Sequence, residues 1–264
     1  MKYIKQIDSR RLYDDGIGDV DLFDFSHAND NEESRIEAIA TVASICYGRH
    51  PVDAKKLVER LRTESGGLPS SAFEFVRNGF THFGALIKNS LRNDPRLLTA
   101  EYRATLTPMS EMSKAHRKNI ATFRIKVPIF IARQVMRHRS FSYQELSRRY
   151  TTDKQAPLEW WNSMGAAFAA QNLLMCDIYE HQWLGYQMLL KDGVPPEQAR
   201  AVLGTGLYTE FWMMGDVPAW SNYFKLRLDP HTQKEHRELA VAMADLLKEH
   251  QPVLWTAVDP QGAE

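Results

Sequence analysis

Residues 121–150 read ATFRIKVPIFIARQVMRHRSFSYQELSRRY, and they carry the clearest structural signal in the chain. Apolar and polar residues alternate from Ala121 to Val127, which is the period of a half-buried β-strand. Pro128 follows, and proline favours the first turn of a helix, where its missing N–H is not needed. Apolar residues then recur at helical spacing, so we predict a strand, a proline and a helix that ends near Arg139.

Five arginines lie between residues 133 and 149, where the predicted helix gives way to a loop. Guanidinium groups bind oxyanions in bidentate fashion, so several of them beside hydroxyl groups suit a phosphate. Such clusters are more often solvated surface, and Ser142 and Glu145 also have the spacing of a capping box that would open a helix from Tyr143. These arginines flank apolar residues, however, and a buried guanidinium without an anion is costly. We therefore interpret the cluster as an anion-binding site.

The composition limits the classes of protein to which the chain can belong. Its 264 residues can bury a sizeable core, and 33 basic residues balance 33 acidic ones, which argues against a general binder of nucleic acid or membrane surfaces. The two cysteines form no C-x-x-C pair, as expected in a reducing cytoplasm. We expect no signal peptide and no membrane span, because no apolar stretch has the necessary position or length. Common metal and phosphate-loop motifs are absent, so we predict no metal site.

Outside residues 121–150 the pattern is mostly helical. Helical apolar spacing predicts helices at residues 35–47, 54–64, 166–190 and 233–250, and a further helix starting at Asp216. The segment 166–190 is apolar around much of its circumference, so we expect a central, buried helix. A short strand is predicted at residues 3–7, and residues 207–215 fit either a strand or the end of a helix. These elements predict an α+β fold, mostly helical, with a small mixed or antiparallel sheet.

The basic cluster also resembles a known family. Arg137-His138-Arg139, followed after seven residues by Ser147, is similar to the Arg-His-Arg-x7-Ser signature of the flavin-dependent thymidylate synthases. Residues 226–235, LRLDPHTQKE, resemble the Leu-Arg-x-x-x-His-x-Gln-x-Glu element of the same family. The resemblance covers about residues 35–260, and it implies a single domain spanning 1–264 in which residues 76–120 are a helical insertion.

The resemblance implies reductive methylation of dUMP to dTMP, with methylenetetrahydrofolate, FAD and NADPH, in a cytoplasmic homotetramer with flavin sites between subunits. The implied partners are small-molecule nucleotide and folate substrates, with no nucleic acid or membrane. An arginine against a pyrimidine carbonyl would stabilise negative charge on the ring without a cysteine adduct. Two alternatives stay open: a family enzyme with altered substrate or product, such as dCMP or hydroxymethylation, and a non-catalytic phosphate- or RNA-binding module.

The matched positions imply site residues. Flavin contacts are expected from Ser71, Glu74, Arg137, His138, Arg139, Glu145, Asn222 and His231. Substrate contacts are expected from Gln134, Arg137, Glu145, Ser147, Arg148 or its backbone N–H, Arg149 and Arg227. The implied catalytic residues are Arg227, which would polarise the pyrimidine ring, and Ser147, which would bind the nucleotide rather than act as a covalent nucleophile. Glu210 and Asp216 stand where some members carry an arginine and an asparagine.

Overall fold

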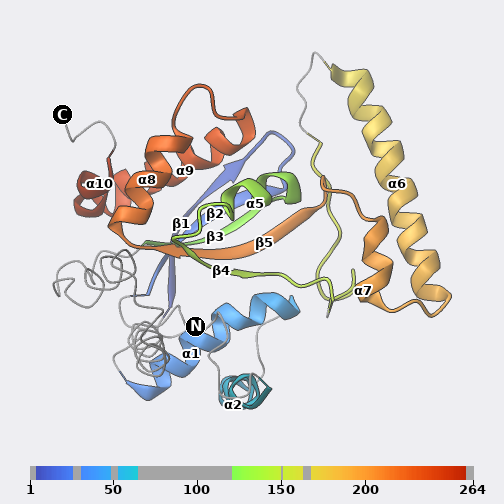
Figure 1. The fold of residues 1–264 in the computed structure, drawn as a ribbon, viewed down its shortest axis with the longest axis horizontal. Coiled ribbons are helices and arrows are strands. Elements are labelled where there is room, and N and C mark those ends of the chain that lie inside the picture. Colours follow the sequence, from blue (N-terminus) through green and yellow to red (C-terminus); the bar gives the residue numbers. More distant parts are fainter. Residues whose placement is uncertain are drawn as a thin grey trace, which may run out of the picture.

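The computed structural model describes residues 4–25, 31–48, 53–64, 121–149, 151–162 and 168–259. Its centre is a five-stranded sheet in the order β1-β2-β3-β5-β4, in which every neighbouring pair is antiparallel (Figure 1). The strands are β1 (Lys5–Leu12), β2 (Gly18–Asp24), β3 (Ala121–Pro128), β4 (Ser142–Glu145) and β5 (Tyr208–Gly215). The predicted α+β class is confirmed, and the sheet is antiparallel rather than mixed. The predicted insertion at residues 76–120 lies outside the described residues.

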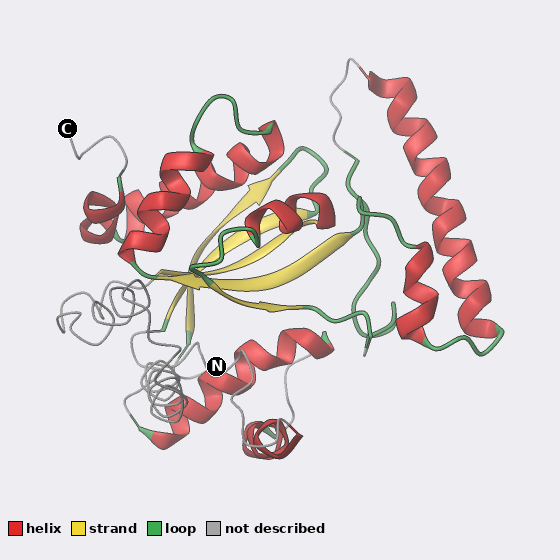
Figure 2. Cartoon of the chain, in the orientation of Figure 1, coloured by secondary structure: helices red, strands yellow, loops and turns green. Residues whose placement is uncertain are grey.

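Helices lie on both faces of this sheet (Figure 2). One face carries α5 (Ile129–Val135), α8 (Val217–Arg227), α9 (Lys234–His250) and α10 (Pro252–Val258), which share one apolar core with the strands. The other face carries α1 (Glu32–Ser44), which the 3-10 turn η1 (Ile45–Tyr47) extends, and α2 (Ala54–Glu64). Strand β5 serves both cores, because Phe211 and Met213 face the first while Trp212 and Met214 face the second.

Several local predictions are confirmed. Residues 121–127 form β3, the central strand, and Pro128 lies between it and α5. Asp216 caps α8 by accepting a hydrogen bond from the Ala219 N–H at 3.0 Å. Residues 207–215, which fitted either a strand or a helix end, contain β5. The strand predicted at residues 3–7 continues to Leu12, where it pairs with β2.

One structural alternative and one prediction are wrong, because pairing with a distant strand outweighs local spacing. Ser142 and Glu145 do not form a capping box, because residues 142–145 pair with β5 from Met214 to Phe211. The side chain of Glu145 instead accepts a hydrogen bond from the Thr209 hydroxyl at 2.7 Å. Helix α5 ends at Val135, short of Arg139, because the chain turns there to enter β4.

The helix predicted to be central and buried stands at the side of the sheet. It is α6 (Ala169–Lys191), and it packs mainly against α7 (Pro196–Ala199) and the 3-10 turn η6 (Arg200–Val202) (Figure 1). Its large apolar side chains are exposed, with Leu173 at 70% and Met188 at 64%. Apolar residues around a helix predict that its surface will be covered, but not by which part of which chain. No helix in the described ranges has the length and apolar character needed to cross a membrane.

Candidate functional site

The candidate site is built where three helix ends meet beside β3. Helix α5 ends at Val135, and the turn that follows is held from both sides. The hydroxyl of Tyr143 lies 2.9 Å from the carbonyl oxygen of Val135 and 3.1 Å from that of His138, so its single hydrogen is shared between these two acceptors. Phe141 packs edge-on against Trp220 with ring centroids 4.6 Å apart. It also fills the space beside Gly215, where a Cβ atom would collide with its ring.

His138 and Arg227 form the centre of the site. The Nε–H of Arg227, at the end of α8, donates to Nε2 of His138 at 2.8 Å, so this ring nitrogen carries no proton. Burial and the Arg227 charge lower the pKa of His138 to about 4, and the imidazole is therefore neutral near pH 7. The sequence placed both residues in the site, and the structure brings them together although 89 positions separate them.

A second histidine lies behind this pair and was missed by the sequence analysis. His236 is fully buried on α9, and its Nε2 lies 3.2 Å from the Tyr223 hydroxyl. Its Nδ1 lies 3.3 Å from Oε1 of Gln134, a predicted substrate contact on α5. Burial, Arg227 and His138 lower the pKa of His236 to about 3. The available signal was its spacing, since His236 lies three residues before Leu239 on the apolar stripe of α9.

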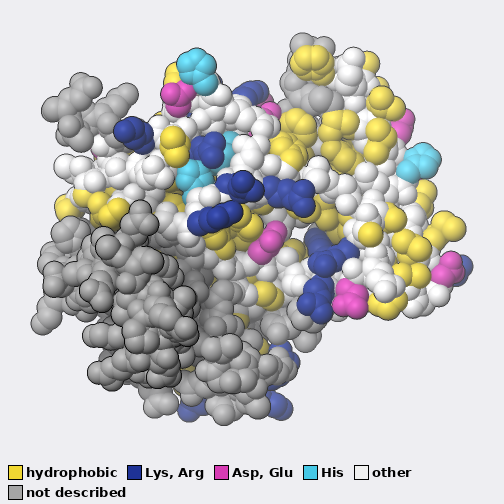
Figure 3. Space-filling view, in the orientation of Figure 1, with side chains coloured by type: hydrophobic (Ala, Val, Ile, Leu, Met, Phe, Trp, Pro, Cys, Tyr) yellow, Lys and Arg dark blue, Asp and Glu magenta, His cyan; other side chains and the backbone are white. Residues whose placement is uncertain are grey.

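Exposed arginines lie on either side of His138 in the chain. Arg133, Arg137 and Arg139 are exposed, and no carboxylate in the described part of the chain forms an ion pair with them. Figure 3 shows lysine and arginine side chains gathered at the centre of this face beside a histidine. Guanidinium groups that lack a protein partner attract an oxyanion. The surface formed by these three arginines, which we call the arginine face, can therefore hold a phosphate or pyrophosphate.

Three expected substrate contacts, Ser147, Arg148 and Arg149, lie in the segment after β4 and have contacts within the protein. The guanidinium of Arg148 is buried and donates to the carbonyl oxygens of Ala156 at 2.5 Å and Pro157 at 2.9 Å. This corrects the expectation that the Arg148 side chain binds the substrate, because the side chain stabilises the following loop. Its backbone N–H is the only part of the residue still expected to contact the substrate. Ser147 is half-buried and accepts a hydrogen bond from the Arg149 N–H at 3.3 Å. The exposed Arg149 side chain lies 3.5 Å from Glu197 of α7.

The remaining expected flavin contacts do not join this cluster through any hydrogen bond within the described residues. Asn222 is exposed on α8. The side chain of His231 is 96% exposed and lies 2.9 Å from Asp229. Ser71 and Glu74 lie outside the described residues.

Glu210 and Asp216, the two departures from the family pattern, have structural partners. Glu210 lies 3.3 Å from the guanidinium of Arg124, which is also bonded to the buried carboxylate of Asp21 at 2.8 Å. Asp216 is the cap of α8. Both side chains therefore stabilise the framework.

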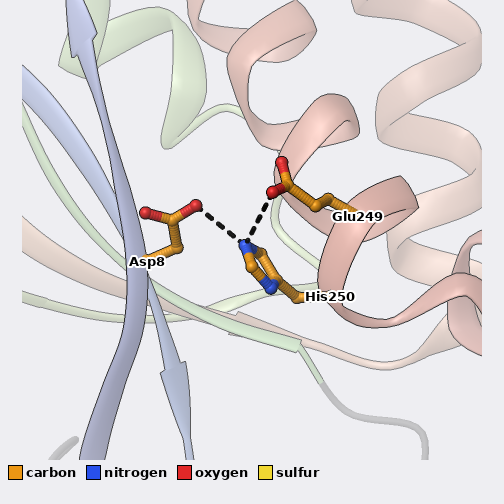
Figure 4. A group of neighbouring side chains, drawn as sticks. All are labelled: Asp8, Glu249 and His250. Carbon is orange, nitrogen blue, oxygen red and sulfur yellow. Dashed lines mark hydrogen bonds and ion pairs between the residues drawn. The ribbon is translucent and has the colours of Figure 1, made fainter.

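A separate polar cluster lies at the far end of α9 (Figure 4). Nε2 of His250 lies 2.8 Å from Asp8 of β1 and 3.8 Å from Glu249. The three residues offer ligand atoms within 4.8 Å of one another, the spacing of a cation site. However, the guanidinium of Arg10 contacts both carboxylates at 2.5 Å and offsets half of their charge. The cluster is an ion-pair network between β1 and α9.

The fold and the site define an α+β protein that offers an anion a donor-rich face, supported by two neutral histidines. Residues 29–253 match the family described as thymidylate synthase complementing protein, and the chain belongs to that family. The family expected from the sequence is confirmed.

Curated relatives are similar over about half of the chain. The chain is 38% identical over 149 residues to the flavin-dependent thymidylate synthase of Thermus thermophilus, covering 52% of this chain and 55% of that protein. It is 35% identical over 144 residues to the enzyme of that name from Thermotoga neapolitana, covering 52% of this chain and 64% of that protein. The chain thus spans about half to two thirds of the length of these two relatives.

Proposed function

We propose that this protein catalyses the reductive methylation of dUMP to dTMP, with methylenetetrahydrofolate as carbon donor, FAD as cofactor and NADPH as reductant. Family membership and the names of the relatives support the reaction. The observation that carries the proposal is the Arg227–His138 pair, which sets a cationic guanidinium against a neutral acceptor at the centre of the arginine face.

In this proposal the arginine face binds the nucleotide. Arg137 supplies charge for the phosphate, and Arg149 adds a second charge by exchanging its exposed pairing with Glu197 for the ligand. Gln134, Ser147 and the backbone N–H of Arg148 donate hydrogen bonds. A charge-assisted hydrogen bond to the phosphate contributes about 1.5–3 kcal/mol. Glu145, which is exposed beside these donors, supplies an acceptor for the sugar or the base.

Arg227 is the proposed activating residue. Its Nε–H is committed to His138, and its two terminal nitrogens make no hydrogen bond within the described residues, so they can face a ligand. A guanidinium against a pyrimidine carbonyl stabilises the negative charge that makes the ring carbon nucleophilic. The neutral His138 orients the guanidinium plane by accepting a hydrogen bond from it, and it adds no positive charge that would repel the guanidinium.

The donor groups on this face also fit a flavin dinucleotide. FAD carries an anionic pyrophosphate, and Arg137 and Arg139 are exposed guanidiniums without an acid partner in the described part of the chain. We assign its binding to these two residues and His138, with Glu145, Asn222 and His231 as further contacts and Ser71 and Glu74 from the segment not described. When bound, the flavin would supply the redox chemistry, and the protein residues position and charge the site.

We further propose a cytoplasmic homotetramer. The exposed apolar side chains of α6 support self-association, since Leu173, Leu174 and Met188 are each more than half exposed. In Figure 3 hydrophobic side chains spread over the part of the surface where Figure 1 places α6. Both cysteines are free thiols, as expected in a reducing compartment. Sedimentation equilibrium measures the oligomeric state directly.

The two alternatives lack a specific observation in their favour. Glu210 and the insertion at residues 76–120 leave room for an altered substrate or product. The ion pair with Arg124 accounts for Glu210 within the sheet, and the insertion lies outside the described residues. A non-catalytic module does not account for membership of a family whose curated relatives are named as enzymes.

The proposal is tested by incubating the purified protein with dUMP, methylenetetrahydrofolate and NADPH and identifying the product by mass spectrometry. We expect dTMP, and a yellow protein with flavin absorbance near 450 nm, roughly the position common to flavins. Hydroxymethyl-dUMP as the final product, or turnover of dCMP in preference to dUMP, would replace the proposal with the altered-substrate alternative. A colourless protein that binds FAD under no condition would reject it.

A further inference from the structure

A chain of hydrogen bonds runs from the interior of the protein to the arginine face. It begins at the fully buried Tyr223, passes through His236 and Gln134, and ends at Gln233 and Glu235 near the start of α9. Gln233 and Glu235 belong to the family element at residues 226–235, and Gln134 is an expected substrate contact, whereas Tyr223 and His236 were not singled out in the sequence. The direction of these bonds decides which atom of the Gln134 amide faces a ligand.

The buried end of the chain sets one direction. The hydroxyl hydrogen of Tyr223 needs an acceptor, and within the described residues its only hydrogen-bond partner is Nε2 of His236 at 3.2 Å. A neutral imidazole that accepts at Nε2 carries its proton on Nδ1. The Nδ1–H of His236 therefore donates to Gln134 at 3.3 Å, and the amide oxygen of Gln134 must face the histidine.

The surface end sets the same direction independently. An ionised carboxylate accepts hydrogen bonds only, so Gln233 turns its NH₂ group toward Glu235 at 2.9 Å. The oxygen of Gln233 is then the atom that faces Gln134, and it accepts from Nε2 of Gln134 at 2.6 Å. Both ends thus require that the Gln134 amide turns its NH₂ group away from His236.

We infer that His236 is a positioning residue for nucleotide binding, which holds the Gln134 amide with its NH₂ group toward the arginine face. One N–H of that group is taken by Gln233, and the other is left for an oxygen acceptor of the ligand. The site therefore recognises an acceptor, such as a phosphate or carbonyl oxygen, and excludes a donor at this point. This inference rests on the proposed function, because it names the nucleotide as the ligand.

The inference is tested with His236→Leu, Gln134→Ala and the double variant. Calorimetric affinity for dUMP should fall about tenfold in each single variant, which corresponds to loss of one hydrogen bond. The double variant should bind no more weakly than Gln134→Ala alone, because His236 acts through Gln134. The KM for dUMP should rise with little change in kcat. His236→Asn, whose side-chain N–H can replace Nδ1–H, should restore most of the affinity. His250→Leu, in the ion-pair network at the far end of the same helix, is the matched control.

Additive losses in the double variant, or unchanged dUMP affinity in His236→Leu, would overturn the inference while leaving the proposed function intact. Failure of the wild-type protein to bind dUMP would instead overturn the proposed function and the nucleotide assignment together. The geometry has its own readout in the unliganded protein, which does not depend on activity or on a variant that folds. ¹⁵N NMR at pH 7 should show the His236 proton on Nδ1, and a proton on Nε2 would overturn the inference.

Discussion

The two histidine clusters at opposite ends of α9 use the same side chain in opposite surroundings. His236 and its neighbour His138 are buried beside Arg227, and both have their pKa lowered well into the acid range. His250 lies at the surface between two carboxylates, 2.8 Å from Asp8 and 3.8 Å from Glu249. A buried histidine beside a cation remains neutral and accepts hydrogen bonds, whereas a histidine beside carboxylates joins an ion-pair network. The neighbours therefore decide that the first cluster supports a ligand site and that the second joins β1 to α9.

The largest effect is expected from breaking the centre of the buried cluster. Arg227→Ala should lower turnover of dUMP by about 10²–10³, because charge that develops on the pyrimidine carbonyl loses its stabilising partner. Arg227→Lys should recover little, since an ammonium does not reproduce the planar fork that bonds both His138 and a ligand. Single-turnover kinetics should find NADPH-driven flavin reduction far less affected. Near wild-type turnover in Arg227→Ala would end the ring-activation role.

The pH dependence of stability sharpens the comparison next. The pKa of His236 is about 3 in the folded protein and about 6.5 in an unfolded chain. Between those values the unfolded chain binds a proton that the folded protein does not, so stability falls as the pH falls from 6.5 toward 3. The slope is about 1.4 kcal/mol per pH unit for one proton. Urea titrations at several pH values measure how the free energy of unfolding changes with pH. In His236→Asn this pH dependence should be smaller by that amount, and an unchanged pH dependence would mean that His236 is protonated in the folded protein.

A smaller effect is expected at the edge of the arginine face. Ser147→Ala should weaken dUMP binding by up to about tenfold, because one hydroxyl hydrogen bond to the nucleotide contributes roughly 0.5–1.5 kcal/mol. The melting temperature should hardly change, since this hydroxyl only accepts from the Arg149 N–H at 3.3 Å. Calorimetry with dUMP decides the matter, and unchanged affinity would assign Ser147 to the loop structure alone.

The smallest effect is expected in the surface cluster. Arg10 and His250 hold the pKa of Asp8 well below its usual range, so its stabilisation is present at neutral pH and is lost as the pH falls below about 4. Asp8→Asn should therefore lower stability slightly at pH 7, and less so in high salt, because exposed ion pairs are weak and screened. Denaturation at two salt concentrations measures this. A loss as large as that of a buried core substitution would contradict the comparison.

The sequence alone determined those features that depend on a few neighbouring residues. Alternation from Ala121 to Val127 and the proline after it specified β3 and the start of α5, and Asp216 specified the start of α8. The arginine and histidine motifs identified the family, because chemistry at fixed spacing is visible without the fold. These signals are local, since strand alternation and helix caps act within one or two turns or pleats.

Tertiary structure alone decided what each side chain meets. Nothing near Ser142 indicated that residues 142–145 would pair with β5, and nothing near Arg148 indicated that its guanidinium would turn to backbone carbonyls. The link from His236 to Gln134 joins residues 102 positions apart, and the surface of α6 stayed uncovered despite its apolar sequence. Hydrogen bonds and burial depend on which groups approach one another in space, so a long-range partner can override a local preference that favours another structure.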